Sequence, residues 1–288
     1  MTTWKLSAAI LVLSAVTSGS AIAQSAGPYY TVTRSLGNAT YVAGGPSCNT
    51  GDLAMYAEAY GYTSSGAFSS TMQIETAAVG VIGPGGGCGV YNPKGDSVYC
   101  SLVCKTLEAG ETTSDYYINY NWNEAKYGTP KGAGSVTAYC NGNDPLVGGG
   151  FQALGHRPQV GGIGFENINA YPAMDTSGHD YYYAGGYWDG GNGQPGTYDV
   201  LYSFALCKAN GDRTQYYQAV SAQQSGSGVK DLVAYCENGD YPLISGLEGT
   251  DIYYMSYIDN DFAGHLASVR GNGVNHGTSW ASTMCRRH

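Results

Sequence analysis

Apolar and aromatic residues lie in short segments along most of the chain, and turns rich in Gly, Asn and Asp separate them. Short segments of this kind are typical of β-strands, whereas the 3.6-residue period of an amphipathic helix is hard to find after residue 23. The pattern therefore predicts an all-β protein.

The first residues follow a different pattern. Lys5 precedes an apolar run at residues 6–16, and the small residues Ala21 and Ala23 lie just before Gln24. A basic start, an apolar run and a small-residue cleavage site are the features of a secretory signal peptide, and the run is shorter than the roughly 20 apolar residues of a membrane span. We expect residues 1–23 to be cleaved, and the rest to be secreted, at the cell surface or in the periplasm, without membrane insertion.

Three landmarks recur three times in the same order. They are a Tyr pair, a Cys followed four residues later by Asp, and a Cys that has an aromatic residue five positions before it and Lys or Arg directly after it. The pairs are Tyr29-Tyr30, Tyr116-Tyr117 and Tyr216-Tyr217; the second landmark is Cys48 to Asp52, Cys140 to Asp144 and Cys236 to Asp240; the third is Cys104, Cys207 and Cys285. Gly and Asn before each Asp favour turns, in which Asp bonds backbone amides.

This recurrence predicts three tandem, disulfide-closed β-sandwich or barrel-like repeats after the cleaved signal peptide. Their expected bounds are residues 24–110, 111–212 and 213–288. The segments are long enough for small β-domains. Whether they stand apart or share one interface stays open at this level.

Eight cysteines in a secreted chain indicate disulfides, and the recurrence narrows the pairings. If every repeat closes its own first and last landmark, the remaining two cysteines flank a turn around Asn92-Pro93 and can meet across a hairpin. The predicted bonds are Cys48–Cys104, Cys140–Cys207, Cys236–Cys285 and Cys88–Cys100.

The second repeat carries a Cys, a short Gly-containing turn, an apolar pair and the run Gly148-Gly149-Gly150, followed by a closing strand that ends in Cys207. It resembles the Cys/Gly-Gly-Gly disulfide β-modules of bacterial extracellular and pilus-tip adhesin-like proteins. The other two repeats depart from the glycine run, and Asn49, Asn141 and Glu237 replace the Pro expected after the first Cys. The resemblance implies a β-module used for binding or display, and it brings no catalytic residues.

The composition narrows the range of possible binding partners. The net charge is −9 and 12% of residues are charged, so the basic footprint of a nucleic-acid-binding protein is absent. Tyr (27) far outnumbers Phe (5). Tyrosine combines an apolar ring with a polar tip, and therefore suits half-buried strands or contact faces.

Known catalytic and metal-binding patterns are missing from the sequence. After residue 23 there is no Gly-x-Ser-x-Gly, and the five His residues stand singly. Residues 189–193 and 259–261 could offer oxygen ligands to Ca²⁺, although neither completes a spaced calcium loop. We predict no catalytic residues, no metal site and no cofactor, with Ca²⁺ as the alternative; the three recurrent Asp residues are expected to be turn residues.

Tyr and Trp alternate with Asn, Asp and Gly in residues 115–127, 180–192 and 251–261. Exposed rings can stack on sugars while neighbouring polar groups bond hydroxyls, although the same rings could instead fill the core. The candidate ligand-binding residues are Tyr116, Tyr117, Trp122, Tyr183, Trp188, Asp189, Tyr253 and Tyr254.

These residues favour a non-enzymatic adhesion protein whose partner is an extracellular glycan or protein surface. Low charge with abundant Gly and Tyr also fits a self-assembling surface protein, and a secreted hydrolase with an unrecognised site is a further alternative. The oligomeric state is not predicted.

Overall fold

A computed structural model describes most of the chain. The described residues are 23–67, 69, 72–79, 84–126, 132–155, 165–188, 198–226, 228–237, 239–249, 252–261, 266–273 and 278–288. They form β-strands and two short 3-10 helices, η1 (Thr113–Asp115) and η2 (Arg213–Gln215), with no α-helix in this part of the chain. The all-β prediction is confirmed.

The strands fall into three successive stretches. In residues 23–105 they are β1 (Ala23–Ala26), β2 (Tyr29–Gly37), β3 (Tyr41–Gly44), β4 (Leu53–Tyr62), β5 (Gln73–Val79), β6 (Gly86–Tyr91) and β7 (Ser97–Lys105). In residues 116–208 they are β8 (Tyr116–Lys126), β9 (Gly132–Tyr139), β10 (Leu146–Gly155), β11 (Phe165–Met174), β12 (Asp180–Trp188) and β13 (Tyr198–Lys208). In residues 216–286 they are β14 (Tyr216–Val220), β15 (Gln224–Ser225), β16 (Gly228–Ala234), β17 (Tyr241–Gly249), β18 (Ile252–Asp261), β19 (Leu266–Gly273) and β20 (Thr278–Arg286).

The antiparallel pairing follows one order in each stretch. In the first, β2 pairs with β7, β7 with β4, β5 with β6, and β6 with β3. The same order links β8–β13, β13–β10, β11–β12 and β12–β9. It also links β14–β20, β20–β17, β18–β19 and β19–β16. Each stretch therefore contributes two groups of three strands.

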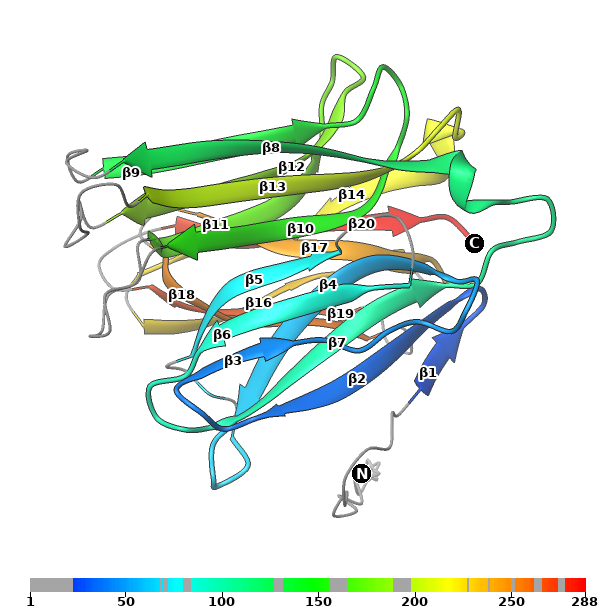
Figure 1. The fold of residues 1–288 in the computed structure, drawn as a ribbon. Coiled ribbons are helices and arrows are strands. Elements are labelled where there is room, and N and C mark those ends of the chain that lie inside the picture. Colours follow the sequence, from blue (N-terminus) through cyan, green and yellow to red (C-terminus); the bar gives the residue numbers. More distant parts are fainter. Residues whose placement is uncertain are drawn as a thin grey trace, which may run out of the picture.

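Strands from different stretches share sheets. β10 pairs with β5 and, over one residue, with β4, while β17 pairs with β11. Figure 1 shows β8, β13, β10, β5, β6 and β3 following one another across the molecule. The predicted segments 24–110, 111–212 and 213–288 thus do not stand apart, because half of one segment continues a sheet that another segment begins.

The glycine run of β10 lies where three strands approach closely. A Cβ on Gly148 would lie 2.1 Å from the Met55 carbonyl oxygen in β4, and a Cβ on Gly150 would lie 2.0 Å from the Ala77 oxygen in β5. Gly246 of β17 meets the Ala170 oxygen of β11 in the same way, at 2.0 Å. Glycine is required at these points because any side chain would push the strands apart.

All four predicted disulfides are present, and none of the cysteines is free. The bonds are Cys48–Cys104, Cys88–Cys100, Cys140–Cys207 and Cys236–Cys285. Each joins cysteines of one predicted segment. Disulfides form and persist in oxidising compartments, so their number indicates such a location.

The core between the sheets is largely aliphatic. Leu53, Ile74, Leu102 and Leu146 are fully buried, and Phe151 lies among them. Tyr29, Tyr56 and Tyr182 are also buried. Other tyrosines lie in cross-strand pairs on the outer faces of the sheets, such as Tyr41 with Tyr91 and Tyr139 with Tyr181. The abundance of Tyr therefore serves the core and the surface together.

Candidate binding surface

The start of β8 is fixed by a turn beside the second disulfide. The Tyr117 hydroxyl donates to Asp144 Oδ2 at 2.8 Å and accepts from the Asn141 amide at 2.7 Å. The Asp144 amide in turn donates to the Asn141 carbonyl at 3.0 Å. Burial, together with the bond to Asp144, raises the pKa of Tyr117 to about 12, which keeps its hydroxyl protonated. Tyr117 is therefore tied into the scaffold.

The same arrangement occurs in the other two stretches. Tyr30 donates to Asp52 at 2.6 Å, and Tyr217 donates to Asp240 at 3.0 Å. The turn position of the recurrent Asp residues is confirmed, since each amide donates to the carbonyl three residues earlier; their carboxylates, however, bond Tyr hydroxyls in place of the neighbouring amides expected from the sequence. Each carboxylate joins the opening strand to the turn after a bridged cysteine.

An aromatic platform follows on the outer face of β8 and β13. We define it by four residues: Tyr120, Trp122, Tyr202 and Phe204. Tyr120 lies opposite Phe204 in the register, and Trp122 lies opposite Tyr202. The rings of Tyr120 and Trp122 are stacked with centroids 6.1 Å apart, and those of Tyr202 and Phe204 are stacked at 5.9 Å. Tyr120 is 60% exposed and Trp122 is 53% exposed, so two large rings of the platform face solvent.

Three of the four platform positions carry smaller side chains in the first stretch, while Tyr99 stands at the position of Tyr202. The three stretches can be aligned on the Tyr that faces a bridged cysteine. Three residues after this Tyr, β8 and β13 have Tyr120 opposite Phe204. The same position has Thr33 opposite Ser101 in the first stretch and Val220 opposite Ser282 in the third. Ser35 of β2 takes the place of Trp122. The β2–β7 pair forms without rings at the positions of Tyr120, Trp122 and Phe204, so the fold itself does not account for these three rings.

The opposite face of β8 carries an asparagine seam, defined by Asn119, Asn121 and Asn123. Their Nδ2 atoms donate to the backbone carbonyls of Tyr139, Thr137 and Ser135 in β9, at 2.7, 3.1 and 3.1 Å. β8 and β9 belong to different sheets. The two-residue spacing of the amides matches the spacing of carbonyls along β9, so the seam joins the two sheet edges.

A second aromatic group lies beyond this seam, on β9, β11 and β12. Tyr139, which is 49% exposed, contacts Tyr181 with centroids 5.3 Å apart, and Tyr171 stacks on Tyr183 at 4.9 Å. Tyr183 lies opposite Thr137, whose carbonyl accepts the Asn121 bond. Two predicted residues, Trp122 on β8 and Tyr183 on β12, therefore lie on strands that are separated by β9.

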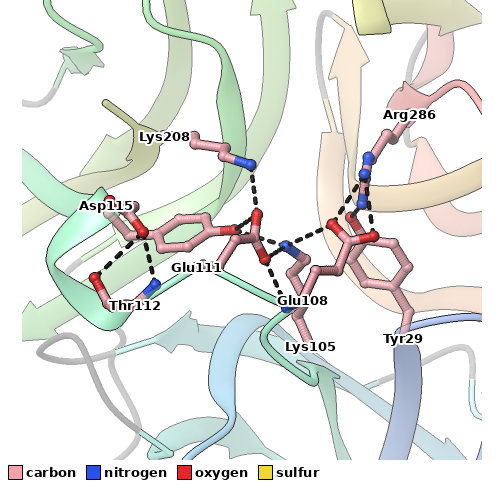
Figure 2. A network of polar contacts seen from close by, with 9 residues as sticks. Tyr29, Lys105, Glu108, Glu111, Thr112, Asp115, Lys208 and Arg286 are labelled. Atoms are coloured by element: carbon pink, nitrogen blue, oxygen red, sulfur yellow. Dashed lines mark hydrogen bonds and ion pairs between the residues drawn. The ribbon is translucent and has the colours of Figure 1, made fainter. Parts of the chain in front are cut away.

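Tyr116 lies elsewhere, in a buried polar cluster where β8 begins directly after η1. It is 3% exposed; its hydroxyl accepts from Lys105 Nζ at 2.7 Å and donates to Glu111 Oε1 at 3.0 Å. Glu111 also pairs with Lys105 and with Lys208, as Figure 2 shows. Burial would raise the pKa of Glu111, but the hydrogen bonds from Lys105 and Lys208 outweigh it and hold the pKa at about 2.

The polar cluster extends to the first and last strands. Arg286 donates to the Tyr29 hydroxyl at 3.0 Å and pairs with Glu108 at 3.0 Å (Figure 2). Lys105, Lys208 and Arg286 end β7, β13 and β20. The connection between β7 and β8 supplies both carboxylates, and it therefore ties the ends of all three stretches together.

Several predicted residues cannot be placed as side chains. Trp188 ends β12, and Tyr253 and Tyr254 lie in β18, but only their backbone is described. Asp189 and the remainder of residues 189–193 lie outside the described residues, as do the side chains of residues 259–261. Within the described part of the chain, no group of three or more His, Cys, Asp or Glu residues could hold a metal ion.

The sequence interpretation omitted Tyr120, Tyr202, Phe204 and Tyr139 from the candidate residues. Tyr120 stands two residues before Trp122, so the alternation of a β-strand places both rings on one face. Phe204 and Tyr202 come from a distant strand, and only the β8–β13 register brings them to the same surface.

Among the described residues, no helix is long and apolar enough to cross a membrane. Comparison of the chain with protein-family models and with curated proteins gives no match.

Proposed function

We propose that this protein is a secreted, non-enzymatic binding protein that contacts an extracellular glycan through the aromatic platform. The observation that carries the proposal is the contrast between Tyr120 and Trp122, both more than half exposed, and the smaller Thr33 and Ser35 at equivalent positions. Large solvent-facing rings that the scaffold does not need are characteristic of a contact surface.

Glycan suits this surface better than a second protein. The platform lies on one face of two paired strands, and rings on such a face can stack on the apolar side of a sugar ring. Asn121, the exposed member of the asparagine seam, places its amide oxygen beside the Trp122 backbone amide, where sugar hydroxyls need partners. A few fixed polar groups beside apolar rings are the usual composition of a small-ligand site.

The test is binding of the intact, disulfide-bonded protein to immobilised polysaccharides. Burial of one ring against a ligand contributes on the order of 1.5 kcal/mol. The double variant Tyr120→Ala/Trp122→Ala should therefore bind about 100-fold more weakly. Because both rings are exposed, its unfolding midpoint should stay close to that of the wild type.

The matched control is Thr33→Ala/Ser35→Ala, at the equivalent positions of β2, which should leave glycan binding unchanged. Equal loss of binding in both variants, or in neither, would contradict the proposal. Light scattering of both variants separates glycan binding from self-assembly, because a loss of oligomers in Tyr120→Ala/Trp122→Ala without any glycan effect would favour a self-assembling protein.

A further inference from the structure

The polar atoms next to the platform have an unequal balance of donors and acceptors. Asn119 Nδ2 donates to the Tyr139 carbonyl at 2.7 Å and to Asn141 Oδ1 at 3.1 Å, so both of its hydrogens are engaged. Asn121 and Asn123 each commit one hydrogen to β9. The amide oxygens keep the greater share of the remaining bonding capacity, since each carries two lone pairs.

Asn121 stands at the open edge of β8. Its Oδ1 accepts from the Trp122 backbone amide at 3.0 Å while its Nδ2 reaches the Thr137 carbonyl at 3.1 Å. The residue is exposed, and β8 is the last strand of its sheet. A ligand stacked on the ring of Trp122 can therefore reach the second lone pair of this oxygen across the strand edge.

The charges near the platform favour the same kind of ligand. Glu124 is exposed on β8, two residues beyond Trp122 and on the same face of the strand. Lys105, Lys208 and Arg286 are engaged in the polar cluster. The chain as a whole carries a net charge of −9. A polyanion would meet acceptor oxygens at the surface of a protein that is itself negatively charged.

The geometry points to a linear, uncharged glycan laid along β8 with its rings on Tyr120 and Trp122 and with a hydroxyl or amide N–H group donating to Asn121 Oδ1 at the strand edge. This inference rests on the proposed function and narrows it. Carboxylate or sulfate groups only accept hydrogen bonds at neutral pH, so a uronate-rich or sulfated glycan offers fewer donors per sugar to Asn121 than a neutral glycan does.

The experiment is affinity electrophoresis of the intact protein. It measures how strongly the protein is retarded in gels that contain a neutral β-glucan, a soluble N-acetylated glucosamine polymer or polygalacturonate. For at least one of the first two polymers, the apparent Kd should be at least tenfold lower than for polygalacturonate. Asn121→Ala should weaken retardation several-fold. Glu124→Lys should reduce the preference against polygalacturonate.

Two different failures can be told apart. Strongest retardation by polygalacturonate, abolished by Tyr120→Ala/Trp122→Ala, would overturn the specificity inferred here and leave the proposed glycan-binding function standing. Retardation by none of the polymers, or retardation that the double variant does not change, would overturn the function as well. Near-UV circular dichroism of Asn121→Ala controls for folding, and the Thr33→Ala/Ser35→Ala variant controls for changes remote from the platform.

Discussion

The strand pairs β8–β13 and β2–β7 begin in the same way and then diverge. Tyr117 and Tyr30 each lie opposite a bridged cysteine and each donate to a turn Asp. Three residues further along, Tyr120 faces Phe204, whereas Thr33 faces Ser101 with their hydroxyl oxygens 2.6 Å apart. The shared part holds the fold together, and the divergent part is available for function.

The third strand of each three-strand group, β4 in the first stretch and β10 in the second, explains how the smaller residues are covered. In the first stretch, Tyr60 of β4 stacks on Tyr99 with centroids 5.5 Å apart. Burial raises the pKa of Tyr60 to about 12, partly offset by its hydrogen bonds with Ser101 and Thr33. In the second stretch, Gln152 of β10 takes the position of Tyr60, opposite Tyr202. The same arrangement of strands therefore presents two different surfaces. Tyr60 covers the surface of β2 and β7, whereas the aromatic platform on β8 and β13 stays open.

The largest expected effect tests the shared part. Removing Cys140–Cys207 or Cys48–Cys104 by paired Cys→Ala substitutions should each lower the free energy of unfolding by about 4 kcal/mol, because each bond closes a long loop. Since β10 pairs with β5, either loss should lower one common transition in urea denaturation. Two separate transitions, with only one displaced, would show that the stretches are energetically independent.

The next effect concerns the polar cluster between the two strand pairs. Glu111→Gln removes charge-assisted bonds to Lys105 and Lys208 and should cost on the order of 2 kcal/mol at neutral pH. The pKa of Glu111 lies at about 2 in the fold, below its ordinary 4.5, so its contribution is present above pH 4.5 and is lost as the pH falls towards 2.

Urea denaturation at several pH values measures this dependence. The wild type and Glu111→Gln should differ most near neutral pH and converge below pH 4.5. Glu108→Gln serves as the control, because its carboxylate is more exposed and pairs with Lys105 and Arg286 at the rim of the cluster. A difference between wild type and Glu111→Gln that stays constant with pH would contradict the assignment.

A smaller effect tests the platform itself. Phe204→Ser gives β13 the residue type that β7 has at Ser101, and it removes the ring that lies 6.4 Å from Tyr120 and 5.9 Å from Tyr202. Loss of this half-buried ring should cost about 1 kcal/mol of stability and lower glycan affinity up to about tenfold. Calorimetric titration with the retained polysaccharide measures the second quantity. Unchanged affinity would restrict the site to Tyr120 and Trp122.

The smallest effect compares the two strand edges. Asn121→Ala should lower the unfolding free energy by about 1 kcal/mol or less, since one exposed amide bond to β9 is lost. Arg34→Ala in β2 removes an exposed bond of 3.2 Å to Gly45 and should cost less than about 0.5 kcal/mol. Thermal melts of both variants check the order, and a larger cost for Arg34→Ala would show that the asparagine seam does not hold the edges of β8 and β9 together.

Tyr116 and Trp122 show where sequence reasoning reaches its limit. Both belong to one Tyr/Trp-rich segment and both were predicted to face a ligand, yet Tyr116 is 3% exposed and Trp122 is 53% exposed. They share one face of β8, because an even number of residues separates them. The connection that carries Glu111 covers Tyr116 and leaves Trp122 open. Alternation predicts the face, whereas burial depends on what packs against it.

The sequence by itself determined the all-β class, the four disulfides and the turn role of Asp52, Asp144 and Asp240, because strand alternation and turn chemistry are local and the recurrence narrowed the cysteine pairings. Only the tertiary structure decided that the stretches share sheets, that Tyr120 and Trp122 meet Tyr202 and Phe204, and that three cations gather around two carboxylates. These features depend on pairing between strands that are far apart in the chain. The two-residue alternation along a strand does not reveal its partner, because it is the same whichever strand lies alongside.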